Sequence, residues 1–148
     1  MHMHPEIPPF LKTQRVGVMA IEMLDGAPHA ATVHFAFKED QSVFVYETSR
    51  LYRKSEPLLN RKTSRASFVV GFEEGKNSKT FQTDGEVRLL TDADKALIDY
   101  YLATFPEKQA KAADPINIFF TFTPDWWRFT DWSKPTGKTI YTSTDQPL

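Results

Sequence analysis

Apolar and polar residues alternate along several short stretches of the chain, and this period of two is typical of half-buried β-strands. The clearest stretch is 29–37, where Val33, Phe35 and Phe37 alternate with small or polar residues. Asp25-Gly26, just before it, predicts a hairpin turn. Further strands are predicted at 16–23, 43–48, 67–72, 80–90, 116–123, 126–130 and 138–141.

Helical patterns are fewer and shorter. Early prolines favour a short helix at 5–13, and apolar positions after the third strand favour another at 52–61. Thr91, followed by Asp92 and Asp94, is typical of a helix start, because a threonine caps free N–H groups and acids suit the first turn. Apolar residues then recur at helical spacing until Pro106 ends the run.

The predicted strands follow one another without alternating helices. This order excludes a doubly wound parallel sheet and favours a mainly β fold, an antiparallel barrel with helices at its edges. The 148 residues contain no Gly-x-Gly-x-x-Gly after a strand and no Walker sequence. We expect one domain over residues 1–148.

Composition narrows the classes of function. Because the chain has no cysteine, disulfides, thiol nucleophiles and cysteine metal sites are excluded. No apolar run is long enough to span a membrane, and the first residues do not form a secretory signal, so we expect a cytoplasmic protein. The net charge of −1 argues against nucleic acid or anionic lipid as a bulk partner.

One segment departs from this balance. Residues 50–65 contain six basic residues and one acidic residue, so the segment carries +5 and the rest of the chain −6. Arg53 and Lys54 begin the predicted second helix, where cations are unfavourable unless an anion lies between them and the free N–H groups. Together with the nearby hydroxyl of Thr48, they predict a phosphate site; solvated surface charges are the alternative.

Other candidates are less specific. Tyr46 could stack on a planar ligand or pack in the core, and His34, on a face of small residues, could contact a ligand or serve as a structural histidine. Thr80 and Gln82 share one strand face and could bind the rim of a heterocycle, and Gly85 predicts a bulge. No spacing supports a metal site or a Ser-His-Asp triad.

The order of these pieces carries a family resemblance over residues 10–142. It rests on Asp25-Gly26-x-Pro28, 29–37, 43–48, Arg53-Lys54 followed by Leu58, Leu59 and Asn60, 67–71, 80–87, and Pro124-Asp125-Trp126-Trp127-Arg128. The chain resembles the FMN-binding split-barrel proteins related to pyridoxamine 5′-phosphate oxidase, in particular a general-stress-protein-like member. The resemblance implies a split barrel, usually a homodimer, with two FMN sites at the interface.

The resemblance also implies roles for individual residues. Arg53 and Lys54 would bind the FMN phosphate, and Thr32, Val33 and His34 would contact the isoalloxazine edge. Tyr46, Glu47 and Thr48 would lie near the phosphate, Thr80 or Gln82 would reach the flavin from the partner subunit, and Trp127 would pack near the ring.

The chain also departs from the oxidases. Ala31 and Ala36 stand where they carry an arginine and a lysine, Glu47 replaces a small hydroxyl residue, and their late Arg-x-His motif is missing. We therefore expect a dimeric FMN-dependent oxidoreductase of unassigned substrate and catalytic residues, not the vitamin B6 oxidase itself. The alternatives are the same fold binding F420 or haem, with His34 as axial ligand, and a non-catalytic flavin-binding or stress-response module.

Overall fold

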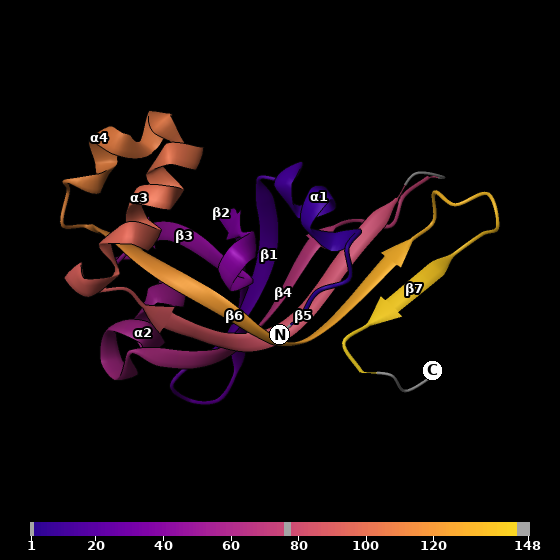
Figure 1. The fold of residues 1–148 in the computed structure, drawn as a ribbon. Helices are drawn as coiled ribbons and strands as arrows, with labels where there is room; N and C mark the ends of the chain where they lie inside the picture. Colours follow the sequence, from indigo (N-terminus) through magenta and orange to yellow (C-terminus); the bar gives the residue numbers. More distant parts are fainter. Residues whose placement is uncertain (1, 76–77, 145–148) are drawn as a thin grey trace.

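Six of the strands close into an antiparallel barrel. The computed structural model describes residues 2–75 and 78–144. Within them the sheet order is β3-β2-β1-β4-β5-β6-β7, and an additional β3–β6 pairing closes the barrel (Figure 1). The strands are β1 (Val16–Glu22), β2 (Pro28–Lys38), β3 (Val43–Ser49), β4 (Thr63–Gly71), β5 (Lys79–Leu89), β6 (Asn117–Asp131) and β7 (Thr139–Thr142).

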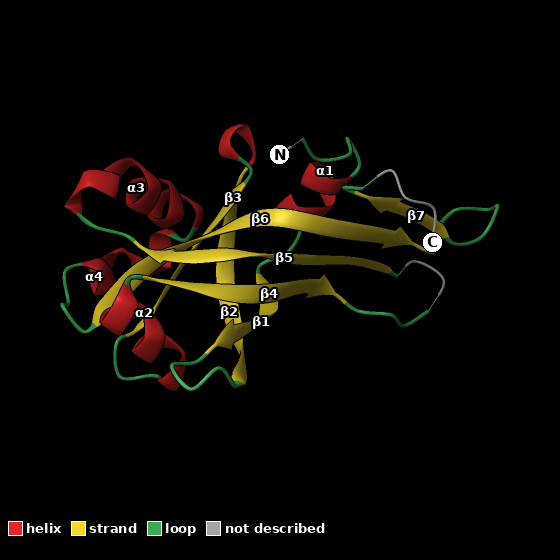
Figure 2. Cartoon of the chain, turned by 90° about the horizontal axis from the view of Figure 1, so that it is seen from below, coloured by secondary structure: helices red, strands yellow, loops and turns green. Residues whose placement is uncertain are grey.

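The helices lie at the ends of this barrel. They are α1 (Ile7–Lys12), α2 (Glu56–Arg61), α3 (Lys95–Thr104) and α4 (Gln109–Ala112). Both views place α2, α3 and α4 together at one end, and β7 with α1 toward the other (Figures 1 and 2). Short 3₁₀ turns precede α2 (Arg53–Ser55) and α4 (Pro106–Lys108).

Aromatic side chains fill the barrel interior. Phe44 is fully buried, and its ring lies 5.2 Å from that of Phe68 and 5.9 Å from that of Phe122. Phe35 meets Phe68 edge to face at 5.3 Å. Edge-to-face pairs of this kind stabilise beyond the area they bury, so the alternating apolar residues of the strands define one core.

The predicted mainly β, split-barrel fold is confirmed, with corrections to single elements. The strands predicted at 116–123 and 126–130 form one strand, β6, because the pairing shifts register between Asp84 and Gly85 and carries the ladder past Pro124. A Cβ on Gly85 would lie 2.1 Å from the carbonyl oxygen of Thr123, so the predicted bulge needs glycine there.

The other corrections concern boundaries and one missed helix. The strand predicted at 67–72 begins four residues earlier, at Thr63. The helix predicted at 52–61 is a 3₁₀ turn followed by α2, which starts at Glu56, so Arg53 and Lys54 precede the α-helix. The helix start predicted at Thr91 is a capped 3₁₀ turn (Asp92–Asp94) that runs into α3, and the N–H of Thr91 donates to the Asp94 carboxylate at 2.9 Å. Helix α4 was not predicted, and residues 1, 76–77 and 145–148 of the predicted domain lie outside the described residues.

Candidate functional site

A polar cavity opens where β2 and β3 meet the end of the barrel that carries α3 and α4. Its volume is about 220 Å³. Six of the eleven predicted site residues line it: Thr32, Val33, His34, Glu47, Thr48 and Lys54. The structure therefore brings together residues from three separate stretches of the sequence that were assigned to one ligand.

Strand pairing explains this convergence. β2 runs antiparallel to β3, with Phe35 opposite Tyr46, so the residues before Phe35 lie beside those after Tyr46. The chain then turns through the 3₁₀ segment that carries Lys54, and Ser55 anchors that turn by donating its hydroxyl to the carbonyl oxygen of Ser49 at 2.8 Å. The turn thus holds the Lys54 side chain at the end of β3.

Two lysines that the sequence reasoning missed also line the cavity. Lys108 and Lys111 come from the segment between α3 and β6. The Lys108 ammonium donates to the Tyr101 hydroxyl at 2.8 Å and lies 3.8 Å from the Glu47 carboxylate. Burial lowers the pKa of both Lys108 and Lys54, while the Glu47 charge opposes that shift.

One hydroxyl in the cavity has no partner. Thr48 is 5% exposed, and its Oγ1 makes no hydrogen bond to any of the described residues. A buried hydroxyl without a partner costs free energy. Thr48 is one of the residues that line the cavity, so a ligand bound there is an available partner for this hydroxyl.

His34 presents its ring at the same cavity. Burial, together with the charges of Lys108 and Arg15, lowers its pKa from the ordinary value of 6.5. The ring meets Phe105 edge to face at 6.3 Å. At neutral pH the imidazole is therefore mostly uncharged and can donate or accept a hydrogen bond.

The other predicted residues lie elsewhere in the chain. Tyr46 is fully buried in the barrel, with its ring 5.2 Å from that of Phe120, so its side chain does not face this cavity. Trp127 is also in the core, and its Nε1 has no partner among the described residues. Arg53 does not line the cavity, and neither do Thr80 and Gln82 on β5.

Gln82 is nevertheless aligned with the cavity across the sheet. The strand registers form one row in which Thr32 pairs with Val18, Val18 with Val69, and Val69 with Gln82. At about 4.8 Å per strand spacing, Gln82 lies roughly 14 Å from Thr32 along the sheet. The two valines between them are exposed, Val18 at 45% and Val69 at 38%.

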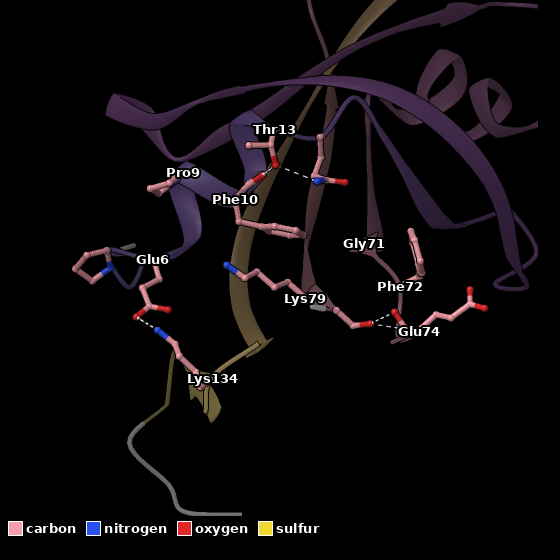
Figure 3. Close-up of a pocket in the computed structure, with 12 residues that line it drawn as sticks. Glu6, Pro9, Phe10, Thr13, Gly71, Phe72, Glu74, Lys79 and Lys134 are labelled. Carbon is pink, nitrogen blue, oxygen red and sulfur yellow. Dashed lines mark hydrogen bonds and ion pairs between the residues drawn. The ribbon is translucent and has the colours of Figure 1, made fainter. Parts of the chain in front are cut away.

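A larger cavity, about 780 Å³, lies between α1 and the β4–β5 turn and holds none of the predicted residues. Phe10 and Phe72 border it, and Lys79 reaches in from β5 (Figure 3). Lys134 pairs with Glu6 at 2.8 Å, and the Lys79 ammonium lies 3.8 Å from the buried Asp131 carboxylate. Since each of these cations has an acidic partner, this cavity does not select an anion.

The comparison with protein families decides the chain's classification. The model of the pyridoxamine 5′-phosphate oxidase family matches residues 3–131. The chain belongs to this family. No protein of curated function matches the sequence significantly.

Solved structures share the family's fold at low sequence identity. A conserved hypothetical protein from Mycobacterium tuberculosis is 15% identical with a TM-score of 0.69, covering 98% of this chain and 94% of its own. A haem-binding protein from Mycobacterium smegmatis is 14% identical, also at 0.69, covering 89% and 54%. A pyridoxamine 5′-phosphate oxidase-related FMN-binding protein from Nostoc punctiforme is 15% identical at 0.65, covering 95% and 90%. Among the described residues of this family member, no helix is both long and apolar enough to cross a membrane.

Proposed function

We propose that this protein is an FMN-binding flavoprotein that acts as a small oxidoreductase in the form of a homodimer. The observation that carries the proposal is the cavity between β2 and β3. Its lining includes three lysines, one carboxylate and a buried hydroxyl without a partner. Two positive charges are left without a counter-charge, and a phosphate monoester carries about −1.5 to −2 at pH 7.

The size of the cavity indicates which part of FMN it would hold. About 220 Å³ is below the range of roughly 300–1,000 Å³ that encloses a whole drug-sized ligand. This volume would hold the phosphate and the adjoining part of the ribityl chain, but not the whole FMN molecule. We place the ring outside the cavity, along β2, where Thr32, Val33 and His34 would contact its edge.

A second copy of the chain would complete that site. The outer face of β1 and β4 exposes Val16, Val18 and Val69, and Gln82 lies in the same row of paired residues. Covering exposed valines is favourable at about 25 cal/mol per Å² of apolar area. In the dimer, Thr80 or Gln82 of one chain would reach the flavin of the other, because one chain does not bring them to its own cavity.

When bound, the flavin would supply hydride or electron transfer. The chain's own residues would bind and orient it: Lys54 and Thr48 at the phosphate, His34 at the ring edge. No side chain is assigned as acid or base, and the substrate is not assigned.

A titration of flavin fluorescence with purified protein tests the proposal. We expect saturable quenching by FMN, weakened at least about tenfold by Lys54→Met, because a hydrogen bond to a charged group contributes about 1.5–3 kcal/mol. Lys95→Met is the matched control, since Lys95 is an exposed lysine paired with Asp99 on α3. Absence of FMN binding by the wild type would refute the proposal, and binding of F420 in its place would reassign the ligand.

Haem is the second candidate, favoured by the position of His34. Its imidazole lines the cavity and is mostly uncharged at neutral pH, as an iron ligand must be. A haem-binding protein from Mycobacterium smegmatis shares the fold. An absorption spectrum after adding haem decides this: a sharp Soret band that is lost in His34→Ala would support haem, and no spectral change would exclude it.

A further inference from the structure

Lys108 is held in one place beside the cavity. Its side chain is 16% exposed, and its ammonium donates to the buried Tyr101 hydroxyl. The same ammonium lies 5.2 Å from the centre of the Phe105 ring and 5.4 Å from that of Tyr101. Because these contacts already restrict the Lys108 side chain, binding a ligand costs little further side-chain entropy.

Lys111 is brought to the cavity by contacts of its backbone. Its carbonyl oxygen accepts hydrogen bonds from the Asn117 side chain at 2.8 Å and from the N–H of Asp114 at 3.1 Å. Asn117 begins β6 and pairs with Ser49 at the end of β3. The Lys111 side chain forms no ion pair within the parts of the chain that the structure describes.

Glu47 is the only carboxylate among the described residues that line this cavity. Its side chain is 11% exposed, and the 3.8 Å to Lys108 is longer than a hydrogen bond. The Glu47 charge raises the pKa of both Lys54 and Lys108, so it acts on both lysines. One carboxylate thus compensates part of the charge of three ammonium groups.

We propose that Lys108 and Lys111 bind the ligand's phosphate together with Lys54, and that Glu47 sets the net charge of the site to that of a phosphate monoester. The segment 106–112 then determines the preference for a phosphorylated ligand over its unphosphorylated form. This inference rests on the proposed function, since it assigns further residues to the same site.

The test compares FMN with riboflavin, which lacks the phosphate. We expect Lys108→Met and Lys111→Met each to weaken FMN binding about tenfold or more, the loss of one charge-assisted hydrogen bond, with riboflavin binding unchanged. Lys95→Met should change neither. Lys108→Arg keeps the charge and should retain much of the FMN affinity. Glu47→Gln should tighten FMN binding and steepen its dependence on salt, because it removes a negative charge next to the phosphate.

Two results would overturn the inference. One is a Lys108→Met/Lys111→Met variant that binds FMN as the wild type does. The other is an equal loss of FMN and riboflavin binding, which indicates a structural role. If the wild type binds no flavin, inorganic phosphate separates the two proposals. We would then measure the melting temperature with and without phosphate. A rise in the wild type that is absent in the double variant would retain the anion site and reject FMN. No rise in the wild type would reject both.

Discussion

Thr48 has a buried hydroxyl without a hydrogen-bond partner in the described parts of the chain. Replacing this hydroxyl in Thr48→Val should raise the stability of the fold and lower the affinity for FMN. In Thr48→Val a methyl group replaces the hydroxyl at nearly the same volume, and valine suits a β-strand. A buried hydroxyl without a hydrogen bond costs about 1–3 kcal/mol. Because Thr48 is 5% exposed and its Oγ1 has no partner among the described residues, its removal should stabilise the ligand-free protein by about 1 kcal/mol.

The same substitution should weaken FMN binding. A hydrogen bond from Thr48 to the phosphate contributes about 1.5–3 kcal/mol, so its loss should raise Kd roughly 10- to 150-fold. Urea unfolding followed by tryptophan fluorescence measures the first effect, and an FMN titration measures the second. For a domain of this size, 1 kcal/mol corresponds to a rise in Tm of about 2–4 °C.

Thr83→Val is the matched control. Thr83 is equally buried, but its hydroxyl donates to the carbonyl oxygen of Trp126 at 2.6 Å, outside the cavity. Its loss should lower the free energy of unfolding by about 1 kcal/mol and leave FMN affinity unchanged. The reasoning is refuted if Thr48→Val destabilises the protein as Thr83→Val does, or if it binds FMN with wild-type affinity.

Three further predictions concern the scaffold and the dimer. Arg88 holds the pKa of Asp94 at about 2, below the ordinary 3.8, so this pair stabilises the fold above about pH 4 and less as pH falls through 2. The difference in urea midpoint between Asp94→Asn and wild type should therefore be full at pH 7 and shrink steadily as pH falls from 4 toward 2. Gly85→Ala should cost about 1–3 kcal/mol in urea unfolding, because its Cβ would lie 2.9 Å from the Phe122 ring; wild-type stability would contradict the bulge geometry. Val18→Asp should convert the proposed dimer to monomer in sedimentation, and an unchanged mass would place the interface elsewhere.

Local signals in the sequence were enough to predict most of the barrel. Strict alternation predicted β2, and the residues following Thr91 predicted the helix start that leads into α3. The orientation of Tyr46 also follows from the sequence, because Tyr46 lies two residues after Phe44 on the same face of β3 and therefore points into the barrel. Split predictions for β6 arose because Pro124 is typical of a strand end, whereas here a register shift absorbs it.

The candidate site was only partly predictable, because half of it depends on contacts between distant segments. Residues 106–112 lack a clear periodicity, and Lys108 and Lys111 look like solvated surface charges in the sequence. Their place beside β3 depends on Asn117 and Tyr101, whose contacts no local pattern reveals. The dipole argument placed Arg53 and Lys54 at the start of a helix, but α2 begins at Glu56, so Lys54 reaches the cavity from the preceding turn.

The affinity ratio of FMN to riboflavin for the wild-type protein tests the central claim most directly. The two ligands share the isoalloxazine ring and the ribityl chain, and only FMN carries the phosphate assigned to the lysine-lined cavity. With two or more charge-assisted hydrogen bonds to that phosphate, FMN should bind at least about 100-fold more tightly at low salt. Equal affinities for the two flavins would contradict the assignment of the cavity to a phosphate.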